Sequence, residues 1–209
     1  MRTQWSRFSL AVAALTLGMT TACKPKENAA DTTAAMSDTG MGAGMARTDS
    51  AANVSNNGWT DAQILAFAAA ADSGEIAEAK LAQTKATNAQ VKAFARQIVT
   101  DHQAMLKEGS QFASAHNVSA DSTKNDVTDL RKDSRDELKD LTEKKAGADW
   151  DKEYLDNQIE DHKEVLEKLQ DAAKDTKDST LRQMLTKASG KVQEHLTKAQ
   201  ALKDKYPSS

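Results

Sequence analysis

Three histidines of this 209-residue chain lie inside helical apolar patterns, and imidazoles in such positions suggest metal chemistry. Around His102 the apolar residues of the stretch 91–113 recur at helical spacing, and His162 and His195 have similar surroundings. Because a helix turns about 100° per residue, each histidine falls on the apolar face of its helix. Burying an imidazole without a partner is costly, and one shared cation would offset that cost for all three.

A carboxylate is predicted at the level of the histidines. Glu75 interrupts the apolar face of the first amphipathic stretch. Two residues of an antiparallel hairpin lie at one level when they are equally distant from the turn. The midpoint between Glu75 and His102 lies close to Thr87, and the midpoint between the other two histidines falls at residues 178–179. The sequence therefore predicts a site of three histidines and one glutamate, which suits Zn, Fe, Mn or Cu.

Five further polar residues could support the histidines from outside. An acid precedes each histidine and lies about 100° away around its helix, so the two cannot face the same way. Such an acid could accept a hydrogen bond from a histidine of a neighbouring helix, or it could face solvent or lysines. The candidates for these outer contacts are Glu78, Asp101, Gln158, Asp161 and Glu194.

The same residues also permit a metal-free polar core. In that alternative, Glu75 accepts hydrogen bonds from protonated histidines, and Gln158 and waters complete the network. The di-iron pattern of helical bundles, Glu-x-x-His on two helices, is absent, since Val99, Ile159 and Val192 stand three residues before the histidines. One metal or none is therefore expected, and ferroxidase or oxygenase activity is not favoured. The sequence also gives no sign of an apolar pocket for an organic substrate.

The composition favours helices as the elements that position these residues. The two prolines, Pro25 and Pro207, lie near the ends, and aromatic residues make up only 4% of the chain. Four amphipathic stretches of about 25 residues each have one apolar stripe. A thinner stretch over 124–145 is long enough to carry the chain back along the bundle. This order predicts an all-α, ferritin-like four-helix bundle with an additional crossover helix.

Capping residues predict where the helices begin. Thr60-Asp-Ala-Gln63 and Thr87-Asn-Ala-Gln90 each match a capping box. Gly147 is expected to end the crossover helix and Asp149 to cap the next one, while Asp178-Ser179 is expected to cap the last.

The first residues are typical of an exported protein. Two arginines precede an apolar run over residues 8–19, which is too short to span a bilayer, and small residues lead on to the only cysteine, Cys23. This pattern resembles a bacterial lipoprotein signal, in which the cysteine is lipidated; the alternative is an ordinary signal peptide with an incidental cysteine. We expect a lipoprotein-type signal peptide over 1–22, a lipid-anchored low-complexity tether over 23–57 and a helical bundle domain over 58–206.

Such an anchor predicts a periplasm-facing protein of the cell envelope, attached to the outer membrane. The formal net charge is −3 with both signs interspersed, and no basic patch indicates nucleic acid. The charged helix faces are compatible with an envelope protein or peptidoglycan as partner. The sequence leaves the oligomeric state open.

Several motifs together resemble a known family. They are Gly74-Glu-Ile-Ala-Glu-Ala-Lys-Leu-Ala82, Val91-Lys-Ala-Phe-Ala95, Val99-Thr-Asp-His102, Asp151-Lys-Glu-Tyr-Leu-Asp-Asn-Gln-Ile-Glu-Asp-His162 and His195-Leu-x-x-Ala199. In combination they resemble the bacterial envelope family catalogued as domain of unknown function 4142. The resemblance implies a ferritin-like fold and a site in which Glu75, rather than Glu78, joins the three histidines. It implies no reaction.

These observations lead to three functional hypotheses. The first is an envelope lipoprotein whose bundle binds one transition metal ion. The second is a metal-free interaction or stress protein of the envelope. The third is an enzyme with a single-metal redox centre that acts on superoxide or peroxide, which would need an open coordination position.

Overall fold

The computed structural model describes residues 58–206, and all its regular elements there are α-helices. This confirms the predicted all-α class. The predicted signal peptide, Cys23 and the predicted tether lie outside the described residues. No helix among residues 58–206 is long and apolar enough to cross a membrane. The helices are α1 (Asp61–Lys85), α2 (Ala89–Ala115), α3 (Asn125–Glu143), α4 (Ala148–Asp175) and α5 (Ser179–Lys203).

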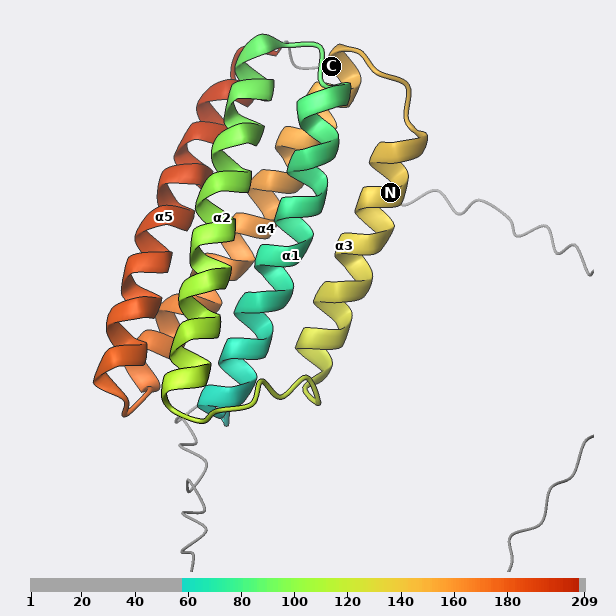
Figure 1. Cartoon of the computed structure of the whole chain (residues 1–209). Coiled ribbons are helices and arrows are strands. Elements are labelled where there is room, and N and C mark those ends of the chain that lie inside the picture. The colour runs from blue at the N-terminus through green and yellow to red at the C-terminus, as the bar shows by residue number, and fades with distance from the viewer. Residues whose placement is uncertain (1–57, 207–209) are drawn as a thin grey trace, which may run out of the picture. The chain divides into compact units, whose positions relative to one another are not determined.

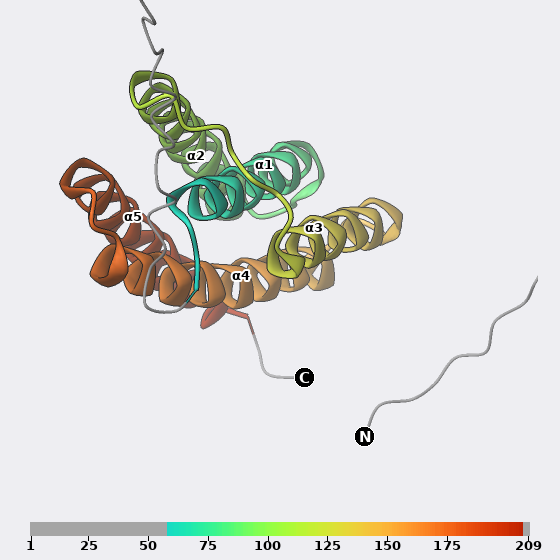
Figure 2. The same ribbon diagram turned by 90° about the horizontal axis from the view of Figure 1, so that it is seen from below.

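The helices form two hairpins joined by a crossover, as the sequence predicts. α1 packs against α2 and α4 packs against α5, and the two pairs meet through α1 with α4 and α2 with α5. Figure 1 shows α3 running along the outside, from the end where α2 stops to the end where α4 starts. Seen from below in Figure 2, α3 lies beside α1 and α4, away from α5.

A close contact sets the position of α3 against α1. An added Cβ on Gly74 would lie 2.6 Å from Ser134 Oγ and 2.9 Å from Ser134 Cβ. The absent side chain of Gly74 therefore allows the two helices to approach at this level.

The turn between α1 and α2 differs from the predicted capping box. Asn88, not Thr87, caps α2, and its side chain accepts a hydrogen bond from the Gln90 amide. The Thr87 hydroxyl instead donates to Asp151 Oδ2 at 2.7 Å. The local sequence pattern predicts that the Thr87 hydroxyl caps α2. In the structure this hydroxyl donates instead to the buried carboxylate of Asp151 on α4.

The remaining helix ends give two confirmations and one correction. The capping box from Thr60 to Gln63 is present, and Asp178 caps α5 through the amides of residues 180 and 181. The prediction that Gly147 ends α3 and that Asp149 caps α4 was wrong. α3 already ends at Glu143, and Gly147 is the N-cap residue of α4. Its φ of 155° explains the glycine, since other residues rarely adopt that conformation.

The apolar core is split into two clusters, and the three histidines lie between them. Along α2, Ile98 belongs to one cluster and Phe112 to the other, with His102 in between. The same order holds on α4 and α5, where His162 and His195 separate members of the two clusters. A polar layer therefore crosses the bundle at mid-height, as the predicted levels require.

Candidate metal centre

The three histidines meet in the buried core, as predicted. One ring nitrogen from each of His102, His162 and His195 lies within 4.8 Å of the others. The side chains come from α2, α4 and α5, and their residues are at most 2% exposed. His162 Nε2 and His195 Nδ1 are 3.3 Å apart, and the His102 ring stands 5.3 Å and 5.5 Å from the other two ring centres.

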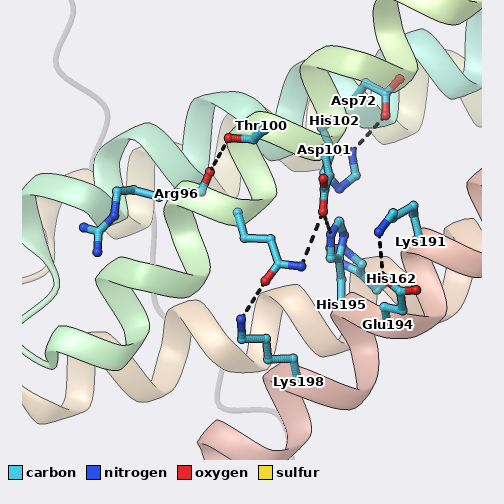
Figure 3. A network of polar contacts seen from close by, with 11 residues as sticks. Asp72, Arg96, Thr100, Asp101, His102, His162, Lys191, Glu194, His195 and Lys198 are labelled. Atoms are coloured by element: carbon cyan, nitrogen blue, oxygen red, sulfur yellow. Dashed lines mark hydrogen bonds and ion pairs between the residues drawn. The ribbon is translucent and has the colours of Figure 1, made fainter.

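Each histidine has its second ring nitrogen beside an acid on another helix. His102 Nδ1 is 2.8 Å from Asp72 Oδ1, and His195 Nε2 is 2.9 Å from Asp101 Oδ2. Figure 3 shows both contacts as dashed lines. The carboxylates accept hydrogen bonds from these nitrogens and so determine which nitrogens remain for a shared ligand.

Glu75 lies beside the outer nitrogen of His162. Its Oε1 is 3.2 Å from His162 Nδ1, an ion-pair distance, although the two atoms are not aligned for a hydrogen bond. Its Oε2 accepts a hydrogen bond of 2.6 Å from the Gln158 amide. The structure thus brings Glu75 and Gln158 to the site, but on the outer side of His162 rather than among the three clustered nitrogens.

The nitrogens left for a common ligand follow from these contacts. They are Nε2 of His102, Nε2 of His162 and Nδ1 of His195. His102 Nε2 is buried and has no hydrogen-bond partner among the described residues. Three converging imidazoles, each held from behind by a carboxylate, form the arrangement that zinc, copper and iron sites use. The donor set therefore fits a transition metal ion.

The electrostatics differ among the histidines. Burial lowers the pKa of His195 to about 4, although the hydrogen bond with Asp101 opposes this. Burial also acts to lower the pKa of His102, but the bond with Asp72 and the charge of Glu75 raise it above its usual value. His195 is thus neutral and ready to coordinate at neutral pH, whereas a metal at His102 has to displace a more tightly held proton.

The acid of Glu75 is kept ionised by the histidines. Burial acts to raise its pKa, but the charge of His162 and contacts with His162 and Gln158 lower it to about 2. A negative charge therefore stays in the core at neutral pH, where it favours a cation nearby.

The other predicted outer residues lie elsewhere. Glu78 and Asp161 form a separate group with Glu137, and this group includes no histidine. Glu194 is exposed and pairs with Lys191 at 2.8 Å, pointing away from the histidines in Figure 3.

Sequence reasoning missed Asp72, although a signal for it was available. Asp72 and His102 are each the same number of residues from Thr87, so they share a level in the α1–α2 hairpin even more closely than Glu75 and His102 do. It also missed Glu137, because α3 approaches the bundle through contacts that local patterns do not encode.

An apolar cavity beside the site corrects the expectation that none would be present. It has a volume of about 250 Å³ and is lined almost entirely by apolar groups of α1, α2, α4 and α5. Asp72, the partner of His102, forms part of its wall. The cavity was not foreseen because small residues such as Gly109, Ala113 and Ala188 create it by their combined placement, not by a pattern in any one helix.

The comparisons with known proteins identify a family but no activity. The family model described as Domain of unknown function (DUF4142) matches residues 43–202. No curated protein and no solved structure matches the chain. The matched residues include the three clustered histidines and all of the four hairpin helices except the last residue of α5. Since the match covers most of the sequence, the chain belongs to the DUF4142 family.

Proposed function

We propose that the protein binds one transition metal ion in the bundle core through His102 Nε2, His162 Nε2 and His195 Nδ1. The observation that carries this proposal is the convergence of three buried imidazoles from three helices to within 4.8 Å. Imidazole is a common ligand of Zn, Cu, Fe and Mn, and three protein ligands leave one position of a tetrahedral site for water or a small molecule.

The roles of the acids follow from their places. Asp72, Glu75 and Asp101 stand behind the three histidines and orient their rings. Their negative charge increases the basicity of the imidazoles and offsets the charge of the bound cation. In this proposal Glu75 supports His162, and the charge that it retains at neutral pH helps to hold the ion.

A metal-free polar core is the second candidate function, and the three acid–histidine contacts favour it. Protonated histidines beside Asp72, Glu75 and Asp101 would each have an acid as counter-charge without an ion. In that case the charged outer faces would carry the function, through an envelope protein or peptidoglycan. Replacing the three histidines by apolar residues would then keep or raise the stability.

Elemental analysis of the whole chain, purified without a metal-affinity tag, separates these candidates. We expect about one metal ion per chain, and its loss together with thermal stability in His102→Ala and His162→Ala. The control is His116→Ala, because His116 caps the exposed end of α2. If no metal is present and Zn, Mn, Fe or Cu fails to raise the melting temperature, the metal-free candidate is correct.

The apolar cavity supports a catalytic variant of the metal proposal. A small uncharged molecule such as hydrogen peroxide could approach the site through the cavity, whose wall includes Asp72. The assay is turnover of peroxide, and separately of superoxide, by the metal-loaded chain. Rates equal to those of His102→Ala would exclude this activity.

The envelope location is part of the proposal. The apolar run over residues 8–19 and the lone Cys23 support export and lipid attachment. Replacing Cys23 by Ser should abolish incorporation of labelled fatty acid in the producing cell. Labelling that persists in Cys23→Ser would contradict lipidation at this residue.

A further inference from the structure

A second group of ionisable side chains lies where α1, α3 and α4 meet. Glu78, Glu137 and Asp161 each place one carboxylate oxygen within 4.8 Å of the others. The three helices contact one another pairwise, so the group joins α3 to the bundle. None of these acids belongs to the three-histidine cluster.

Glu78 is the buried member, and one of its two carboxyl oxygens lacks a hydrogen-bond partner. The residue is only 2% exposed, and its Oε2 has no hydrogen-bond partner within the described part of the chain. A small cavity lies beside it, lined by Glu75, Glu78, Ser134 and Asp161 among others, with a volume of about 10 Å³. That volume is close to what one water-sized particle needs.

The hydroxyl of Tyr154 adds a second unpartnered atom near Glu78. Tyr154 is fully buried on α4 and its hydroxyl has no partner among residues 58–206. Burial, followed by the charges of Glu75 and Glu78, raises the pKa of this hydroxyl. One buried oxygen on α1 and one on α4 thus lack hydrogen-bond partners within the described residues.

Acidic side chains crowd around this cavity and raise one another's pKa values. Burial and the charges of Glu75 and Asp161 raise the pKa of Glu78 to about 10. Burial and the charge of Glu75 raise the pKa of Glu137 to about 7. The acids therefore have to hold protons at neutral pH unless a cation replaces those protons.

The close contact between α3 and α1 lies at the same level of the bundle as the three acids. Gly74 and Glu78 lie one turn apart on α1, and Ser134 and Glu137 lie about one turn apart on α3. The close contact between Gly74 and Ser134 thus sets the distance between the two glutamates.

We propose that Glu78, Glu137 and Asp161 bind a hard divalent cation, of the kind represented by Mg²⁺, Mn²⁺ and Ca²⁺, between α1, α3 and α4. The donors are all carboxylate oxygens, which such ions prefer, whereas the histidine cluster offers nitrogen to softer metals. The ion neutralises the crowded acids and fixes α3 on the bundle. The site is chemically distinct from the three-histidine site, and it stands if that site binds nothing.

The test is a titration of the metal-free whole chain with Mn²⁺, followed by the electron paramagnetic resonance signal of the free ion. The variants are Glu137→Gln, which removes one donor from a half-buried position, and Glu143→Gln, a matched exposed change on the same helix. A third variant, His102→Ala, disables the histidine site. Circular dichroism checks that each variant keeps its helix content.

We expect one Mn²⁺ to bind at this carboxylate site in the wild type, in Glu143→Gln and in His102→Ala, beside any ion that the intact histidines hold in the first two, and at least about tenfold weaker binding at this site in Glu137→Gln. Equal affinity of Glu137→Gln and wild type would overturn the proposal. So would the absence of binding of Mn²⁺, Mg²⁺ or Ca²⁺ up to about 1 mM. Binding that is lost in His102→Ala but kept in Glu137→Gln would place the ion at the histidines, which supports the proposed function and overturns this second site.

Discussion

Each buried histidine uses its two ring nitrogens for different purposes. The outer nitrogen lies beside Asp72, Glu75 or Asp101, and the inner nitrogen faces the other two rings. The hydrogen bonds with Asp72 and Asp101 thereby fix the tautomers and ring directions of His102 and His195 before any ligand arrives, while Glu75 acts on His162 through its charge. Periodicity predicted the histidines correctly, because burial on one helix is a local property. Their acid partners depend on which helix is the neighbour. The sequence therefore predicted Asp101 as an acceptor for a histidine of another helix without saying which one, and Asp72 follows only from comparing levels along the α1–α2 hairpin.

Asp101 is the acid whose contribution can be removed with least disturbance, since its side chain is 22% exposed. In Asp101→Asn the amide oxygen can still accept the hydrogen bond from His195, but the negative charge is lost. We expect the affinity for Zn²⁺ to fall about 10- to 100-fold, with the fold intact. A competition titration against a coloured chelator measures this. Asp156→Asn, which lies at an exposed pair with Lys203, is the control and should bind like wild type.

Glu78 should give the metal-free protein an unusual pH dependence. Its folded pKa is about 10 against an ordinary value of 4.5, so the unfolded chain releases this proton first as the pH rises. The contribution of Glu78 to stability is thus complete below pH 4.5 and is lost progressively toward pH 10. In excess chelator, the stability of Glu78→Gln relative to wild type should increase from about pH 5 to pH 9.

Urea unfolding at several pH values measures this difference. Glu143→Gln, exposed at the end of α3, should show a constant difference from wild type. If the difference in unfolding free energy between Glu78→Gln and wild type is also constant with pH, the carboxyl group of Glu78 is solvated in the folded protein.

At the scale of elements, α3 connects the two hairpins and also contributes Glu137 to the group of three acids. Its length and its role as crossover follow from the sequence, because an amphipathic stretch of this length can return along a bundle. The exact position of α3 on the bundle does not follow from the sequence, since Gly74 and Ser134 come into contact only when α1 packs against α3. The shift of the α2 cap from Thr87 to Asn88 has the same origin, because the deciding contact comes from Asp151 on another helix.

Gly74→Ala should push α3 away from α1. The new Cβ would overlap Ser134, and relieving such a clash typically costs about 1–3 kcal/mol of unfolding free energy. At Gly109, where an added Cβ meets nothing within 4 Å, the same substitution should stabilise by about 0.5–1 kcal/mol. Urea unfolding compares the two. Adding Ser134→Gly to Gly74→Ala should restore part of the loss, and an absence of coupling between the two sites would contradict the close contact.

At the scale of the molecule, a few buried polar contacts join the two hairpins. Asp151 on α4 accepts hydrogen bonds from the Thr87 and Asn88 amides, both 2.8 Å long, and from the hydroxyls of Thr87 and Tyr206. The hairpin and crossover plan was predictable, because capping residues and apolar stripes are local and helix lengths limit the topology. The hydrogen bonds that Asp151 accepts could not be predicted, since nothing near Asp151 in sequence indicates four donors from two other segments.

Asp151→Asn should destabilise the whole bundle. The amide replaces one accepting oxygen by a donor that faces donors, so at least one charge-assisted hydrogen bond is lost in a buried place. We expect a loss of about 2–3 kcal/mol of unfolding free energy, measured by urea denaturation. Asp149→Asn, two residues away and exposed, should change it by less than about 0.5 kcal/mol. Similar effects of the two substitutions would contradict the stabilising role of the hydrogen bonds to Asp151.

The central claim is that three particular nitrogens hold one metal ion, and nuclear magnetic resonance of the histidine rings tests it most directly. The whole chain, labelled with ¹⁵N, is observed before and after one equivalent of Zn²⁺. The account predicts that the ring signals of His102, His162 and His195 shift together, that the metal-bound nitrogens are Nε2, Nε2 and Nδ1 in that order, and that His116 is unchanged. Ring signals of the three histidines that do not respond to Zn²⁺, or a response in which His102 binds through Nδ1, would contradict it.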